Sequence, residues 1–209
     1  DAALCDAIFE AALPRSAGDL LPTTPAGISV AVADRLGTLA GLFAVVGAPK
    51  ATADPFGLRR AAYGAVQALV ASNTRCDARL ALSEAASLQP VKVAETVVNE
   101  VMEYITRRLE QYLVDGGCGV EAVRAALAER GDDPAFAAAT AIELDTLVKR
   151  KGSDSDELKT AMAVLARPTK LVRGKDLPFD LEVRPGSFET AEETALYDAY
   201  VAARESLGD

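Results

Sequence analysis

The stretch that decides the fold is residues 92–115, KVAETVVNEVMEYITRRLEQYLVD. Its apolar residues recur every three or four positions, which is the spacing that lines one face of an α-helix. Glu103 and Arg107 lie four positions apart, so we expect an ion pair between them on the opposite face. Gly116-Gly117 follows and is expected to end the helix. The apolar face consists of Ala94, Val98, Val101, Ile105, Leu109 and Tyr112.

The rest of the chain carries the same helical spacing, divided by signals in which a capping residue precedes proline. Thr24-Pro25 predicts the start of a helix that runs to about Val46. Asp54-Pro55 and Asp133-Pro134 are signals of the same kind, and we interpret Asp54 and Pro55 as a structural helix start. Thr190–Glu193 has the spacing of a capping box. Together these patterns predict an all-α fold built from one or more helical bundles.

Histidine is absent from the 209 residues, and its absence excludes several classes of chemistry. Ser-His-Asp and Cys-His catalysis both need an imidazole as the general base. Cys5, Cys76 and Cys118 form no CxxC pair, so neither a zinc ribbon nor a dithiol redox motif is expected. No apolar run approaches the roughly 18 residues of a membrane span. We therefore expect no catalytic residue, no metal site and no membrane association in this chain.

The charge of the chain is distributed unevenly. Its formal net charge is −9, from 31 acidic and 22 basic residues, yet residues 149–175 hold eight basic and three acidic residues. A basic segment in an acidic background is a candidate for phosphate contacts. The alternative is a solvated face that neutralises neighbouring acidic helices. The basic residues of this segment are Lys149, Arg150, Lys151, Lys159, Arg167, Lys170, Arg173 and Lys175.

Three motifs near the start of the chain point to a known family. They are PRSAGDLLP at 14–22, ADRLGTLAGLF at 33–43 and DPFGLRR at 54–60. In order and separation they resemble the β subunit of bacterial-type glycyl-tRNA synthetase, whose pattern runs PR-x-AGD-x-LP, ADRLDTL-x-G-x-F and DPF-x-LRR. KLVRG at 170–174 is similar to the KRVxN motif of that family, and residues 188–197 are similar to a segment that follows it.

The resemblance implies a division of the chain into three parts. Residues 1–73 are expected to be the C-terminal part of an HD-like helical domain. Residues 74–91 are expected to be a linker, because the short, broken apolar pattern over 71–91 is typical of a connecting helix or linker. Residues 92–209 are expected to form a helical domain of the anticodon-binding type. The family continues beyond this point and residue 1 is Asp rather than Met, so we expect a piece of a longer chain.

The sequence departs from the family pattern at three positions. Gly37 stands where the family has Asp, Leu171 where it has Arg, and Gly174 where it has Asn. The last two changes remove groups expected to contact RNA. HD-type phosphohydrolases hold their metals with His and Asp, and no histidine can join Asp34 here. We therefore reject metal-dependent hydrolysis and interpret Asp34 as a structural hydrogen-bonding residue.

Arg59 and Arg60 allow two interpretations. They cannot both face the core, because a buried arginine needs a partner. Internal pairing with Asp34 or Asp54 is one interpretation, and contact with RNA phosphate is the other. Both arginines are therefore candidate tRNA-binding residues.

The resemblance also implies a function. Aminoacylation belongs to the α subunit or to a fused α portion, where ATP and Mg would bind, and this chain would need no cofactor. It would bind glycine tRNA and position it for that reaction, in a chloroplast stroma or a bacterial cytoplasm, without DNA or membrane as a partner. The alternative is a helical protein-interaction module derived from this scaffold and docked in a larger organellar assembly. RNA binding predicts a steep loss of affinity with salt, which the alternative does not.

Overall fold

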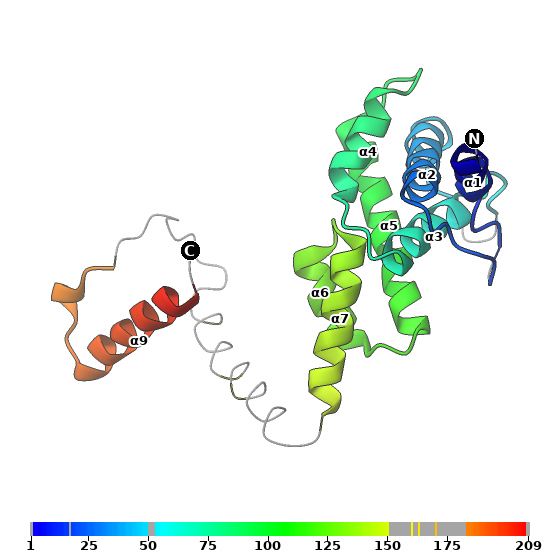
Figure 1. Cartoon of the computed structure of the whole chain (residues 1–209). Coiled ribbons are helices and arrows are strands. Elements are labelled where there is room, and N and C mark those ends of the chain that lie inside the picture. Colours follow the sequence, from blue (N-terminus) through cyan, green and yellow to red (C-terminus); the bar gives the residue numbers. More distant parts are fainter. Residues whose placement is uncertain are drawn as a thin grey trace. The chain divides into compact units, whose positions relative to one another are not determined.

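A computed structural model describes residues 2–16, 18–49, 53–150, 160, 163, 170 and 183–207. These residues form helices and no strand or sheet, which confirms the predicted all-α class. The elements are α1 (Ala2–Ala11), α2 (Pro25–Val46), α3 (Leu58–Ala71), α4 (Ala78–Ser87), α5 (Glu95–Asp115), α6 (Val120–Arg130), α7 (Pro134–Lys149), a 3₁₀ turn (Pro185–Ser187) and α9 (Ala191–Leu207), as Figure 1 shows.

The chain divides into two compact units, Asp1–Leu158 and Lys159–Asp209. The first unit contains α1 to α7, and the second contains α9. Helices on both sides of the predicted linker at 74–91 thus share the core of the first unit. The assignment of these residues to an HD-like and an anticodon-binding domain stays a prediction.

Helix α2 forms the centre of one side of the first unit. It begins as predicted, with Pro25 in its first turn and the Thr24 hydroxyl accepting a hydrogen bond from the N–H of Gly27 at 3.0 Å. It ends at Val46, where Gly47 turns the chain away with a φ of 73°. The helix packs against α1, α3, α4 and α5. Its buried residues include Leu36, Leu39 and Phe43.

Among the described helices, α2 is long and apolar enough to cross a membrane by length and composition alone. This corrects the expectation that no stretch approaches the length of a span, because Asp34 and Arg35 are its only charged residues. However, 44% of its most apolar window is buried inside the protein. The neighbouring helices provide the apolar environment that a core helix of a bundle requires.

Helix α3 begins three residues later than the sequence indicates. Pro55 was expected in the first turn, but residues 54–57 form a turn and the helix begins at Leu58. Gly57 adopts a left-handed conformation with a φ of 68° and has no side chain that could cap the helix. Asp54 supplies the cap instead, because its carboxylate accepts hydrogen bonds from the N–H groups of Leu58 at 2.8 Å and Arg59 at 2.9 Å.

The predicted linker contains a packed helix. Asp77 caps α4 by accepting a hydrogen bond from the N–H of Leu80 at 2.9 Å. Ala78, Leu82 and Ala86 are buried against the core that α2 and α5 share. The short, broken apolar pattern at 71–91 reflects a helix of only ten residues with small buried side chains, rather than an exposed connection.

Helix α5 is the long amphipathic helix that its sequence predicts. Four residues of the predicted apolar face are buried, namely Val98, Val101, Ile105 and Leu109. Tyr112 is half-buried, and Ala94 is exposed as the residue before the first turn. The predicted ion pair forms on the outer face, with Arg107 Nη2 3.1 Å from Glu103 Oε2. The ring of Tyr104 meets that of Phe43 edge to face at 5.3 Å between centroids, which joins α5 to α2.

The remaining predicted starts are confirmed. The Asp133 carboxylate accepts a hydrogen bond from the N–H of Phe136 at 3.0 Å at the start of α7, which packs beside α6. In α9, the Glu193 carboxylate accepts a hydrogen bond from the N–H of Thr190 at 3.0 Å. The Thr190 hydroxyl accepts one from the N–H of Glu193 at 3.2 Å, which completes the capping box.

Candidate nucleic-acid interface

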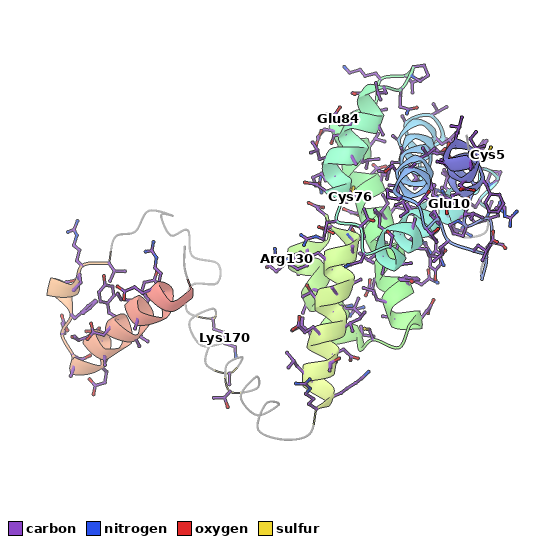
Figure 2. The ribbon with its side chains drawn as sticks, in the orientation of Figure 1. Cys5, Glu10, Cys76, Glu84, Arg130 and Lys170 are labelled. Carbon is purple, nitrogen blue, oxygen red and sulfur yellow. The ribbon has the colours of Figure 1, made fainter. Side chains whose placement is uncertain are left out.

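The basic residues predicted between 149 and 175 fall partly within the described part of the chain. Lys149 is the last residue of α7, and Arg150 follows as its exposed C-cap residue. Lys170, labelled in Figure 2, is also exposed. The other predicted basic residues lie outside the described residues: Lys151, Lys159, Arg167, Arg173 and Lys175. The departures at Leu171 and Gly174 lie outside them as well.

Lys149 takes part in the local packing of helix ends. Its Nζ lies 2.6 Å from Asp145 Oδ2 and donates a hydrogen bond to the carbonyl of Gly117 at 3.2 Å. Asp145 Oδ1 accepts a hydrogen bond from the N–H of Gly119 at 3.0 Å. The hydrogen bond from Lys149 lowers the pKa of Asp145, and the weaker effect of the hydrogen bond from Gly119 lowers it further. The side chain of Lys149 therefore fastens the end of α7 to the turn before α6.

Arg59 and Arg60 lie in the first turn of α3, where the Asp54 cap positions them. Arg59 is half-buried and Arg60 is exposed. Among the described residues, Arg60 forms no ion pair with Asp34 or Asp54. Asp54 instead uses both carboxylate oxygens for backbone N–H groups. The structure thus leaves the guanidinium of Arg60 at the surface.

These two arginines line a surface pocket of about 220 Å³ together with two other arginines. Arg15 comes from the loop that follows α1, and Arg108 comes from α5. Two of the sequence motifs, PRSAGDLLP and DPFGLRR, therefore meet at one place although their arginines lie more than forty positions apart. We call this site the arginine pocket. Its other lining residues are Pro14, Ser16, Tyr63, Gly64 and Gln67.

The arginine pocket has the charge and hydrogen-bonding character of an anion site. No carboxylate is among its lining residues, and each of its four guanidinium groups carries several N–H donors. Burial raises the pKa of Tyr63, and the negative charge of Asp115 adds a smaller increase. The Tyr63 hydroxyl consequently stays protonated at neutral pH and is able to donate. Such a cluster attracts anions even in a chain whose net charge is −9.

Arg108 is the member of the pocket that the sequence analysis does not identify. Its guanidinium lies 5.1 Å from the centroid of the Tyr104 ring, one helical turn earlier. Its Nη1 donates a hydrogen bond to Gln111 Oε1 at 2.8 Å. Its Nε is buried and has no hydrogen-bond partner among the described residues. The sequence signal was the adjacent pair Arg107-Arg108, but only the rotation of α5 shows which of the two faces α3.

The PRSAGDLLP motif builds the loop that carries Arg15. Arg15 Nε and Nη2 donate hydrogen bonds to the Asp19 carboxylate at 2.8 and 3.0 Å, and the N–H of Arg15 donates to it at 2.9 Å. The hydrogen bonds from Arg15 hold the pKa of Asp19 well below its usual range. Gly18 supports this closure with a φ of 76°, which few other residues adopt without strain. The side chain of Arg15 remains 60% exposed.

The expectation that Asp34 is a structural hydrogen-bonding residue is wrong. Asp34 is exposed, and its carboxylate has no hydrogen bond to any residue that the structure describes. Its neighbour Arg35 is the structural hydrogen-bonding residue instead, and it is only 7% exposed. Arg35 donates hydrogen bonds to the carbonyls of Ala31 at 2.8 Å and Leu13 at 2.6 Å. One residue along a helix turns a side chain by about 100°, so the motif alone does not show which residue points inward.

Glu10, labelled in Figure 2, is a second buried charge that the sequence analysis does not single out. Its carboxylate accepts four hydrogen bonds, from the N–H and hydroxyl groups of Thr23 and Thr24 at 2.5–3.0 Å. These bonds, led by that from the Thr24 hydroxyl, lower the pKa of Glu10 to about 2. Glu10 thereby ties α1 to the capped start of α2.

Within the described ranges, no group of three or more His, Cys, Asp or Glu side chains is placed to hold a metal ion. ATP and Mg are expected at the active site of a partner, which concerns residues outside this chain.

Comparison with known proteins identifies the family. The family model described as "Glycyl-tRNA synthetase beta subunit" matches residues 1–128. The chain is 42% identical over 204 residues to "Glycine--tRNA ligase, chloroplastic/mitochondrial 2" of Arabidopsis thaliana, covering 98% of this chain and 19% of that relative. It is 33% identical over 205 residues to "Glycine--tRNA ligase beta subunit" of Enterobacter sp. (strain 638), covering 96% of this chain and 29% of that relative.

A further relative, "Glycine--tRNA ligase beta subunit" of Klebsiella pneumoniae (strain 342), is 39% identical over 130 residues, which cover 62% of this chain and 19% of that relative. The chain thus spans less than a third of the length of these relatives. The motifs at 14–22, 33–43 and 54–60 all lie within the region that the family model matches. The chain therefore belongs to the glycyl-tRNA synthetase beta subunit family.

Proposed function

We propose that this chain is a tRNA-binding, non-catalytic part of a glycine–tRNA ligase. It would hold glycine tRNA so that the acceptor end reaches the active site of the α subunit, or of an α portion fused in the same chain. ATP-dependent aminoacylation would take place there. The relatives from Arabidopsis and from bacteria fit a chloroplast stroma or a bacterial cytoplasm as the compartment.

The observation that carries this proposal is the arginine pocket on the surface of an acidic protein. Arginine forks bind phosphate oxygens bidentately, and phosphate contacts position a protein on a nucleic acid. The pocket concentrates four arginines on one surface of a chain with nine more acidic than basic residues. Arg150 and Lys170 add exposed positive charge elsewhere on the chain.

The test is a comparison of the affinity of the chain for glycine tRNA and for an unrelated tRNA. We expect tighter binding of glycine tRNA, weakened by Arg60→Ala and by the double change of Lys170 and Arg173 to Ala. Equal and very weak binding of both RNAs by the unchanged chain would overturn the proposal.

One observation favours a second function, a helical protein-interaction module. The outer face of α1 leaves Leu4, Ile8 and Phe9 between 55% and 66% exposed. Such a contiguous apolar face is typical of a protein contact. This function predicts that Ile8→Ser and Phe9→Ser weaken association with another subunit of the ligase and leave tRNA binding unchanged. A purified α subunit is the appropriate partner for that measurement.

A further inference from the structure

We propose that the arginine pocket binds a single phosphate group, and that Arg108 is one of the residues that hold it. That this phosphate group belongs to an RNA rests on the function proposed above. The size of the pocket, its four arginines and the unsatisfied Nε of Arg108 do not depend on the identity of the RNA.

The size of the pocket favours a small group. Its volume of about 220 Å³ is below the roughly 300–1,000 Å³ of pockets that enclose drug-sized ligands. A whole nucleotide would therefore project out of it, whereas one phosphate group would fit with its ester oxygens directed toward solvent. The pocket is open to the surface, so a group attached to a large polymer has access to it.

The arrangement of donors favours phosphate over carboxylate. A carboxylate presents two oxygens in one plane, which a single arginine fork binds bidentately. A phosphate group presents more acceptor oxygens, pointing in several directions. The pocket brings guanidinium groups from three separate segments, with Arg15 before α2, Arg60 on α3 and Arg108 on α5. Arg15 is already paired with Asp19, so Arg60 and Arg108, from two separate helices, are the residues expected to provide most of the contacts to the larger ion.

Arg108 has a buried donor that its surroundings leave unsatisfied. Its Nε has no hydrogen-bond partner among the described residues, although its Nη1 is held by Gln111 at 2.8 Å. The guanidinium also lies over the ring of Tyr104, 5.1 Å from its centroid. A buried N–H without a partner is costly, and a bound oxyanion would remove that cost. Arg108 is thus held in place before any ligand arrives.

The first test uses inorganic phosphate and the whole chain. We expect phosphate to raise the melting temperature above that in chloride at equal ionic strength, because a ligand of the folded state stabilises it. Arg60→Gln and Arg108→Lys should each weaken phosphate binding about tenfold or more, the loss expected from removing a charge-assisted hydrogen bond. Arg108→Lys keeps the positive charge but removes the planar guanidinium fork. Because the charge is kept, this variant is the one more expected to fold, and it makes a loss of phosphate binding interpretable.

Arg107→Gln is the matched control. Arg107 is the neighbour of Arg108 on α5, its side chain is 69% exposed, and it pairs with Glu103 on the outer face. It lies outside the pocket, so this change should leave phosphate binding at the level of the unchanged chain. The proposal is overturned if phosphate stabilises the chain no more than chloride does, or if Arg107→Gln reduces binding as much as Arg60→Gln.

The second test separates the pocket from the function of the whole chain. Glycine tRNA is compared with and without its 5′-phosphate: loss of affinity on removal identifies the terminal phosphate as the ligand, and no loss identifies a backbone phosphate. In either case Arg108→Lys should weaken the binding. If inorganic phosphate binds in the pocket but the chain does not prefer glycine tRNA, the phosphate site stands and the proposed function fails. If glycine tRNA binds with full affinity to Arg108→Lys, the phosphate site fails and the function stands.

Discussion

Two charged side chains, Glu10 and Arg35, are buried among the described residues of the first unit, and both hold the start of the chain against α2. A buried charge destabilises a fold unless hydrogen bonds replace the water it loses. Glu10 receives four such bonds from Thr23 and Thr24, and Arg35 donates to the carbonyls of the loop after α1. The same loop carries Arg15, so these two residues also fix the arginine pocket.

The first residue-scale prediction concerns Glu10 and acid. Its pKa is lowered from 4.5 to about 2 in the folded protein, so its carboxylate stabilises the fold above about pH 4.5. That contribution is lost as the pH falls toward 2, because the unfolded chain then binds the proton more readily. Glu10→Gln should therefore lower stability at neutral pH and reduce the loss of stability between pH 4.5 and 2. Urea denaturation across this range measures both effects, and identical pH profiles for the two proteins would contradict the assignment.

The second residue-scale prediction compares two glycines within helices. A Cβ at Gly64 of α3 would lie 2.6 Å from Arg35 Nε, whose guanidinium is held by backbone carbonyls. Gly64→Ala should therefore cost about 1–3 kcal/mol in the free energy of unfolding, as overpacking does. A Cβ at Gly37 of α2 would meet only Gln89 at 3.7 Å, so Gly37→Ala should stabilise by about 0.5–1 kcal/mol. Equal effects in thermal and urea denaturation would show that Arg35 does not occupy this position.

At this scale the sequence identified some site residues and missed others for one reason. Arg59 and Arg60 were found because they follow a recognisable helix start. Arg108 and Arg35 were missed, and Asp34 was given a structural role, because the inward or outward direction of a side chain depends on how its helix is rotated. That rotation is set by packing between α2, α3 and α5, which no single motif contains.

At the scale of elements, the start of α3 depends on a cap that lies four residues before the helix. Asp54→Ala should remove acceptors from the N–H groups of Leu58 and Arg59 and cost about 0.5–2 kcal/mol of stability. Asp34→Ala, at an exposed carboxylate without a described hydrogen bond, should stay within about 0.5 kcal/mol of the unchanged chain. Urea denaturation of both variants measures the two changes in the free energy of unfolding. A larger loss for Asp34→Ala would restore the structural role that the motif suggested.

Most elements were predictable because their signals are local. Cap residues before proline gave the starts of α2 and α7, and apolar spacing gave α5. The start of α3 was predicted too early because the left-handed backbone of Gly57 separates Pro55 from the helix. The capping carboxylate of Asp54 therefore lies four residues before Leu58 instead of directly before it. The segment of α4 was interpreted as a connecting helix or linker, and its place in the core was missed because its buried residues are mostly alanine, whose burial is apparent only once its neighbours are in place.

At the scale of the whole molecule, the proposed function requires an acidic chain to bind an acidic polymer. A net charge of −9 opposes any anion at long range, and only local clusters of arginine and lysine overcome it. Affinity should consequently come from a few phosphate contacts at the arginine pocket and near Arg150 and Lys170. The total charge of the chain acts against that affinity.

The salt dependence of glycine tRNA binding tests this account most directly. Each neutralised phosphate releases condensed counterions, so the logarithm of the association constant should fall linearly with the logarithm of salt concentration. Arg60→Gln should reduce that slope by about one, the change expected from the loss of a single phosphate contact. Arg107→Gln should leave the slope unchanged. An association that is independent of salt, or a slope that Arg60→Gln does not alter, would contradict RNA binding through the arginine pocket.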